Sequence, residues 1–447
     1  MISGRRRLLL AFVDHPAIAN AGWIIGERIG RLLIALVVGI LVFRKLGVDR
    51  LGAFNYALTA ASLFVPLSTC GLGENLVRHL VGGRSNGVML GTAFAMRAAG
   101  TLAAYGFGVA AFLLVPNQTT ATLGDAAVAG LALWSAPLLV LDPYFQSLSR
   151  SRVVTACGLT AGLVAAGVKI IGVLIDAPIR YFLFANALDA ILLGAGLLAV
   201  YVLTTGGERW RFDLTTARGL MREAIPSILT GFAVFIYDQS DVLLLGVLAA
   251  SREVADHQIG LYAAAVRLSS MWRFVPFAIL ASAAPFLYRA QQRDDTSYRA
   301  ALIQTVSIVM VCSYLFIVPL AIWPGEAIQV LLGDGYREAA PVLRVHVFSN
   351  MFAILGVAQS TWLIGRGMLW AGFRNTVIGA VFNVALNVIF IPQHGALGAA
   401  ATTVAATFLA TIPVNALFPA TRPLADILTR GMVLAGMPAM MRRLRKP

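Results

Sequence analysis

VVTACGLTAGLVAAGVKIIGVLI, residues 153–175, carries a single charged side chain, Lys169, and is long enough as a helix to cross a bilayer. A hydrocarbon core of about 30 Å takes roughly 20 apolar residues in helical form. Similar runs fill most of the chain, at 18–43, 51–70, 87–115, 123–148, 179–203, 224–249, 258–288, 298–323, 341–365, 370–392 and 396–418. The sequence therefore predicts an all-α polytopic membrane protein of about 12 transmembrane helices, because lipid leaves backbone polar groups no other partners.

The composition agrees with a membrane protein: 59% of the residues are hydrophobic and 13% are charged. A soluble chain of 447 residues would carry far more charge. The formal net charge of +14 comes mostly from arginines in the loops and ends on one side of the predicted spans, the side of both termini. The positive-inside rule places both termini in the cytoplasm. The basic surface is then expected to face lipid head groups, not nucleic acid.

A weak internal repeat divides the predicted helices into two sets of six. GAFNYA at residues 52–57 returns as GLYAAA at residues 260–265, six predicted helices later and in the same orientation. This pattern is typical of transporters built from parallel repeats, and chance similarity between apolar stretches is the alternative. We expect an N-terminal six-helix lobe at 1–203, a cytoplasmic linker at 204–223, a C-terminal six-helix lobe at 224–420 and a basic cytoplasmic tail at 421–447.

Charged residues inside the predicted spans are the candidate site, because a charge that faces lipid is costly. Cations in a wet cavity suit a polyanionic ligand, since guanidinium groups bind phosphate in bidentate fashion. The candidate cations are Arg28, Arg31, Arg97, Lys169, Arg267 and Arg273. The acidic candidates for ion coupling or ion pairing are Glu27, Asp189, Asp238 and Asp241. For all of them the alternative is a structural ion pair or a side chain that reaches the head groups.

Asp238 and Asp241 fall one turn apart on the predicted seventh helix. One carboxyl group of such a pair in a low-dielectric cavity is a candidate for proton exchange, and an ion pair with Arg267 is the alternative. The sequence has no metal-binding or nucleotide-binding motif, and its three cysteines are isolated in apolar runs. It therefore indicates a protein that is not an enzyme and uses no metal or other cofactor, with an ion gradient as a candidate energy source.

Four stretches occur in a characteristic order along the chain. They are FRKLG with GAFNYA at 43–57, WRFD, YDQSD and GLYA within 210–263, LGDGY with AAPVL at 332–343, and NVALN, IP and GALGAAAT within 383–402. Together they resemble the polysaccharide-transporter family, the Wzx-type flippases of the multidrug/oligosaccharidyl-lipid/polysaccharide exporter (MOP) superfamily. The resemblance implies two lobes around a central cavity.

The resemblance also assigns roles to residues. Asp241 matches the acidic residue of the mid-chain signature, Arg28 or Arg31 looks like the cavity arginine of the first helix, and Arg267 matches a basic cavity position. Within the fourth stretch, we expect Asn383 and Asn387 to make polar packing contacts.

The implied activity is the transfer of an undecaprenyl-pyrophosphate-linked oligosaccharide from the inner to the outer leaflet of a bacterial cytoplasmic (inner) membrane. Alternating access would move it for O-antigen (lipopolysaccharide), capsule or exopolysaccharide biosynthesis. The implied partners are this lipid-linked oligosaccharide, membrane lipids, a polysaccharide polymerase and chain-length proteins. The alternatives are a multidrug exporter of the same superfamily and, from another class, a membrane glycosyltransferase or polysaccharide polymerase, which would need larger outer loops.

Overall fold

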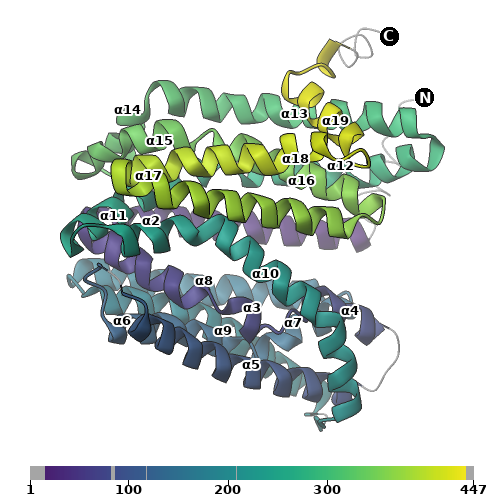
Figure 1. Cartoon of the computed structure of the whole chain (residues 1–447). Coiled ribbons are helices and arrows are strands. Elements are labelled where there is room, and N and C mark those ends of the chain that lie inside the picture. Colours follow the sequence, from purple (N-terminus) through teal and green to yellow (C-terminus); the bar gives the residue numbers. More distant parts are fainter. Residues whose placement is uncertain (1–15, 82–85, 117, 208, 439–447) are drawn as a thin grey trace, which may run out of the picture. The chain divides into compact units, whose positions relative to one another are not determined.

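The computed structural model describes residues 16–81, 86–116, 118–207 and 209–438, with the backbone alone at 16–29, 31–33, 74, 281, 284–285 and 288. Every regular element within these residues is a helix (Figure 1). In this part of the chain, 7 helices are long and apolar enough to cross a membrane, or up to 9 spans when two bent helix pairs are included. The predicted all-α polytopic membrane fold is confirmed.

The chain forms two compact units. Unit 1 contains the described chain up to Lys45, Ala57–Val115 and Ala121–Phe232; unit 2 contains Leu46–Tyr56, Pro116–Thr120 and the chain from Ala233 onward. The first elements in chain order are α2 (Pro16–Ser62), α3 (Val65–Ser68), α4 (Gly73–Val81), α5 (Asn86–Leu114), α6 (Leu123–Gly130), the 3-10 helices η1 (Leu131–Ser135) and η2 (Leu138–Val140), α7 (Leu141–Ser147), α8 (Ser151–Leu174), α9 (Ile179–Thr205) and α10 (Leu214–Leu248). Unit 2 continues with α11 (Arg252–Ser270), α12 (Phe274–Arg293), α13 (Asp295–Ile322), α14 (Pro324–Leu331), the 3-10 helix η3 (Asp334–Ala339), α15 (Ala340–His346), α16 (Ser349–Gly365), α17 (Leu369–Thr411), α18 (Pro413–Leu417) and α19 (Arg422–Met432).

Two pairs of predicted runs are joined by a single glycine turn instead of a loop. Gly47 (φ 73°, ψ 174°) divides α2, and Gly395 (φ 54°, ψ −134°) divides α17. Positive φ is strained for residues with a Cβ, so these two positions favour glycine. The turns explain why runs predicted as separate helices share one continuous element: α2 holds 18–43 with most of 51–70, and α17 holds 370–392 with most of 396–418.

Two spans of unit 2 are broken. Arg252–Ser270 and Phe274–Leu280 meet at 41°, and Asp334–His346 and Ser349–Gly365 meet at 42°. The sequence predicted one uninterrupted run at each place. The breaks leave backbone carbonyl groups without their usual helical donors, and at membrane depth those groups need partners from the protein.

The two copies of the sequence repeat touch each other within unit 2. A Cβ on Gly52 would lie 1.8 Å from the backbone oxygen of Asp256, and a Cβ on Gly260 would lie 2.0 Å from that of Val48. Each glycine begins its copy of the repeat and meets the residue one turn before the other glycine, so the two contacts are equivalent. Only the missing side chains allow the backbones to come this close.

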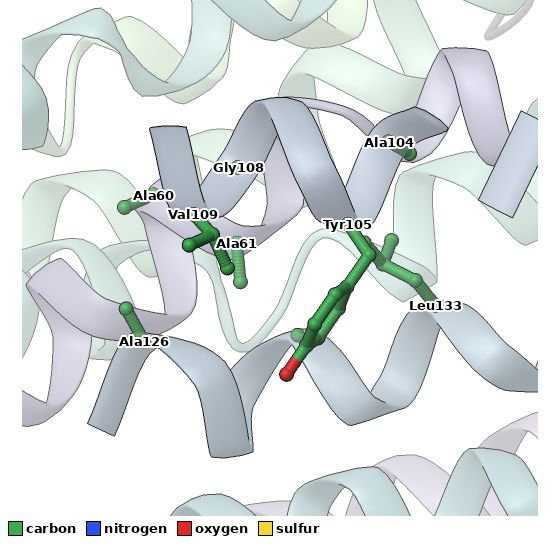
Figure 2. A pocket seen from close by; sticks show the side chains of 9 residues that line it. Ala60, Ala61, Ala104, Tyr105, Gly108, Val109, Ala126 and Leu133 are labelled. Atoms are coloured by element: carbon green, nitrogen blue, oxygen red, sulfur yellow. The ribbon is translucent and has the colours of Figure 1, made fainter. Parts of the chain in front are cut away.

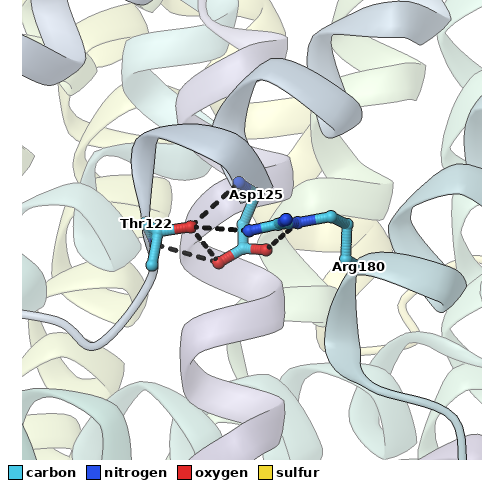
Figure 3. A network of polar contacts seen from close by, with 3 residues as sticks. All are labelled: Thr122, Asp125 and Arg180. Atoms are coloured by element: carbon cyan, nitrogen blue, oxygen red, sulfur yellow. Dashed lines mark hydrogen bonds and ion pairs between the residues drawn. The ribbon is translucent and has the colours of Figure 1, made fainter.

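In unit 1, α6 starts at a capping box (Figure 3). Asp125 N donates to Thr122 Oγ1 at 3.2 Å, and Thr122 N donates to Asp125 Oδ2 at 3.0 Å. Arg180, in the first turn of α9, donates from Nε to Asp125 Oδ1 at 3.1 Å. Reciprocal bonds of this kind satisfy the free N–H groups of the first turn, and here they also tie the starts of α6 and α9 together.

The segment predicted as a basic tail contains an amphipathic helix, α19. Its buried face includes Leu424, Ile427 and Leu428, and it packs on α13. Asp426 on α19 pairs with Arg299 of α13 and with Arg430 one turn further along. The described part of the predicted tail is therefore docked on unit 2 up to the end of this helix.

Candidate functional site

A cluster of polar side chains surrounds Asp241 inside unit 2. Asp241 is 1% exposed. Its Oδ2 accepts hydrogen bonds from Tyr262 Oη and from Thr403 Oγ1, the latter at 2.6 Å, and its Oδ1 accepts one from Asn387 Nδ2 at 2.5 Å. All three donors are uncharged, and no ion pair of Asp241 occurs within the described residues.

A second layer of side chains holds Asn387 in place. Thr402 Oγ1 donates to Asn387 Oδ1, and Asn387 Nδ2 also donates to Asn383 Oδ1 at 3.0 Å. Ser240 Oγ donates to the same Asn383 oxygen at 2.8 Å. The other amide atom, Asn383 Nδ2, is buried and has no hydrogen-bond partner among the residues that the structure describes.

Three helices bring this cluster together. α10 carries Asp241 and α11 carries Tyr262. α17 contributes twice, because Asn383 and Asn387 are one turn apart on the same face before the Gly395 turn and Thr403 follows that turn. The glycine turn thus returns the chain so that side chains from both halves of α17 reach the same carboxyl group.

The chemistry of the cluster follows from two opposing effects on Asp241. Removing a carboxylate from water at membrane depth costs several kcal/mol. Three donors stabilise the ionised form, and hydrogen bonds to a charged group contribute about 1.5–3 kcal/mol each. The desolvation cost and the stabilisation from the hydrogen bonds are of similar size, and no countercharge within the described residues fixes the ionised form. The Asp241 carboxyl group is therefore suited to bind and release a small cation such as a proton.

Asp238 and Arg273 lie beside the cluster. Asp238 is one turn before Asp241 on α10 and is exposed on unit 2. Arg273 lies in the break between α11 and α12, interacts electrostatically with Asp238, and places its guanidinium 5.5 Å from the centre of the Phe277 ring. Its Nε is buried without a hydrogen-bond partner within the described residues. Arg267 is half-buried on α11.

The predicted residues of unit 1 are spread over several helices. Arg97 on α5 is 4% exposed and donates from Nη1 to Ala136 O at 3.2 Å. Lys169 on α8 donates from Nζ to Asn186 Oδ1 at 2.7 Å, and Asp189 is half-buried on α9. Glu27, Arg28 and Arg31 fall on α2, and their side chains lie outside what the structure describes. The structure thus brings together Asp241, Asn383 and Asn387, with Asp238 and Arg273 adjacent.

A pocket in unit 1 has a different character (Figure 2). Its lining includes Ala60, Ala104, Gly108 and Leu133 and no charged residue. The polar tip of Tyr105, the Oη, donates to Ala127 O at 3.3 Å. Small and apolar walls of this kind suit hydrocarbon, not a charged head group. Among the described residues, no group of three or more His, Cys, Asp or Glu side chains is placed to hold a metal ion.

Several residues of the cluster were not singled out in the sequence. Ser240, Tyr262 and Thr402 were quoted only as parts of longer stretches, and Thr403 and the nearby His346 were not candidates. Hydroxyl groups are common in membrane helices, so their type alone carries no signal. A histidine within an apolar run, such as His346 in residues 341–365, was the available signal, since histidine within a membrane span is rare.

One family model matches most of the chain. A sequence model of the family described as polysaccharide biosynthesis protein matches residues 17–291. The probable low-salt glycan biosynthesis flippase Agl15 of Haloferax volcanii is 23% identical over 238 residues, which are 50% of this chain and 48% of that protein. An uncharacterised membrane protein of Methanocaldococcus jannaschii is 33% identical over 119 residues, 26% of this chain and 24% of that one. The matched regions thus span about half or less of each relative.

Solved structures share the fold. The lipid II flippase MurJ in an inward closed conformation has a TM-score of 0.65 and 12% identity, covering 93% of this chain and 91% of that one. An inward-facing multidrug resistance MATE family transporter of the MOP superfamily has a TM-score of 0.60 and 13% identity, covering 88% of this chain and 95% of that one. The predicted fold is confirmed, because the chain shares it with a flippase and a transporter.

Proposed function

Because the chain belongs to the polysaccharide biosynthesis protein family, we propose that it is a flippase for a lipid-linked glycan. The family match covers residues 17–291, more than half of the chain. A relative is named as a glycan biosynthesis flippase, and a protein of the same fold is a lipid II flippase. The cargo we propose is an undecaprenyl-pyrophosphate-linked oligosaccharide, which moves from the inner to the outer leaflet during surface polysaccharide biosynthesis.

The Asp241 cluster is the observation that supports a transport mechanism. A buried carboxyl group with three uncharged donors and no countercharge is costly as a purely structural feature, because apolar residues of similar volume would pack without that cost. We propose that Asp241 takes up and releases a proton during the transport cycle. Its three hydrogen bonds, from Tyr262, Thr403 and Asn387, then change strength with each step.

The cations are proposed to bind the pyrophosphate. Arg273 supports this role in unit 2, because its buried Nε has no hydrogen-bond partner within the described residues. Arg97 offers a similar donor in unit 1. We propose the same phosphate-binding role for four further cations from their place in the sequence: Arg267, Arg28, Arg31 and Lys169. Each is tested by its own substitution. We further propose that the protein spans the cytoplasmic membrane with both termini inside, so reporter fusions after Trp210 should read as cytoplasmic and fusions after Asp176 as external.

Purified protein in proteoliposomes tests the function. The assay measures how fast a fluorescent polyprenyl-pyrophosphate oligosaccharide in the inner leaflet becomes accessible to a membrane-impermeant reagent outside. The proposal predicts accelerated transfer over protein-free vesicles. Because the fold is shared with a MATE family transporter, the same vesicles are tested for export of a cationic dye. Dye export without glycan transfer would replace the flippase by a drug exporter.

A further inference from the structure

The two broken spans of unit 2 are fastened to each other. Ser269, in the last turn of α11, has its Oγ 2.7 Å from His346 Nδ1, in the last turn of α15. Asn350, just after the second break, donates from Nδ2 to Ser269 O at 3.0 Å. All three side chains are buried. The breaks at 271–273 and 347–348 therefore lie together and share their hydrogen bonds.

These bonds satisfy backbone groups that the breaks release. Asn350 Nδ2 donates to the Ser269 carbonyl oxygen, and Ser349 Oγ donates to His346 O at 2.7 Å. At each break some backbone bonds are of the shorter i→i−3 type, such as Arg273 N to Ser270 O at 3.1 Å and Phe348 N to Val345 O at 3.2 Å. Such turns have poorer hydrogen-bond geometry than α-helix, so both segments are places where unit 2 can bend.

The paired breaks also reach the Asp241 cluster. The His346 ring stands edge-on to the Tyr262 ring, at 5.7 Å between centroids and 89° between planes. The hydroxyl of that tyrosine donates to Asp241. A continuous series of buried contacts thus runs from the carboxyl group through Tyr262 and His346 to Ser269 and both breaks. Two further charged groups act on this path besides Asp241. Asp238 interacts electrostatically with Asp241 and Tyr262, and Arg273 interacts with Asp238 and His346.

We propose that the two breaks form one hinge whose setting follows the charge on Asp241, with Tyr262 and His346 as the positioning residues that link them. This rests on the coupling role of Asp241 proposed above. Loss of the charge weakens the bond from Tyr262, which frees the Tyr262 ring to shift. His346 packs on that ring and is bonded to Ser269, so the shift reaches both breaks together. Proton uptake at Asp241 would then change how unit 2 bends at the two breaks.

Hydrogen–deuterium exchange of the full-length protein in nanodiscs tests the link without any substrate. Asp241→Asn is expected to change amide exchange at 270–275 and at 347–351 together, by about three- to tenfold, the range for loss of one buried hydrogen bond. Tyr262→Phe should give the same change. In a Ser269→Ala background the bond between Ser269 and His346 is missing, so Asp241→Asn should no longer move both segments together.

The controls separate this link from general loosening. His346→Phe keeps a ring against Tyr262 but not the bond to Ser269, and His346→Gln keeps a hydrogen-bonding group; the response to Asp241→Asn should vanish in the first and partly return in the second. His394→Phe alters an exposed histidine of the same unit that packs on Phe390 and should leave the response intact. Unchanged exchange in Asp241→Asn, or an equal response in Ser269→Ala, would overturn the hinge. Failure of glycan transfer alongside a linked response would instead reject the flippase and leave the hinge standing.

Discussion

Replacing Gly260 by alanine is expected to destabilise unit 2 by about 2 kcal/mol. The new Cβ would lie 2.0 Å from Val48 O, whereas ordinary contact begins at 3.4 Å, so the two backbones must separate. Overpacking of this kind costs about 1–3 kcal/mol, and we take the upper end because the obstacle is backbone. Alanine is favoured over glycine within a helix by about 1 kcal/mol, which offsets part of the cost. The net loss corresponds to a melting temperature lower by roughly 4–8 °C for a cooperative block of this size.

The assay is thermal unfolding of the purified protein in detergent, followed by intrinsic tryptophan fluorescence. Gly356→Ala is the matched control, because a Cβ at that position of α16 meets nothing within 4 Å. It should melt at the wild-type temperature or slightly above. Gly52→Ala should behave like Gly260→Ala, since its Cβ would lie 1.8 Å from Asp256 O. If Gly260→Ala melts together with Gly356→Ala, the close contact between the two copies of the repeat does not exist.

Three further changes test other parts of the molecule. Thr122→Ala removes the cap of α6 and should cost about 1 kcal/mol of unfolding free energy in a denaturation assay, whereas Thr160→Ala, whose hydroxyl bonds only its own helix, should cost little. Arg267→Ala should slow glycan transfer about tenfold or more at normal protein levels. Arg267→Lys should recover part of the rate, because lysine keeps the charge but cannot make the two parallel hydrogen bonds of a guanidinium group. Loss of transfer only through loss of protein would support a structural role. Burial raises the pKa of Asp426, but bonds from the arginines of α13 and α19 outweigh this and hold that pKa below its ordinary 3.8. The ionised form is therefore favoured by folding, and its contribution is complete above pH 3.8 and lost as the pH falls through the lowered pKa. Melting temperatures across about pH 2 to 6 should therefore fall further on acidification in the wild type than in Asp426→Asn.

Hydrophobic patterning was enough to predict the membrane fold and the positions of the helical runs. The signal is strong because each run must satisfy its own backbone in lipid. The patterning missed the breaks at 271–273 and 347–348, since an apolar run looks the same whether its helix is straight or bent. The glycine turn at Gly395 was visible only as one glycine among many in the chain, because nothing local marks a positive φ.

The candidate site could be predicted only in part. Asp241 was predictable because a carboxylate in an apolar run is costly and so informative. Of its neighbours, Asn387 was expected only as a polar packing residue. Tyr262 and Thr403 were not predicted as partners, because they come from helices far from Asp241 in the sequence and are unremarkable one by one. Which hydroxyl or amide meets the carboxyl group depends on how α10, α11 and α17 pack, and that is decided by the folded structure.

The central claim is that the protein transfers a lipid-linked glycan and that Asp241 couples this transfer to proton movement. The most direct measurement is the transfer rate of a fluorescent polyprenyl-pyrophosphate oligosaccharide in proteoliposomes, with and without an imposed pH gradient, for the wild type, Asp241→Asn and the exposed control Asp334→Asn. We predict that the gradient changes the rate for the wild type and for Asp334→Asn, and that Asp241→Asn is at least about tenfold slower and does not respond, which corresponds to about 1.4 kcal/mol or more. Wild-type rates with an unchanged gradient response in Asp241→Asn would contradict the account.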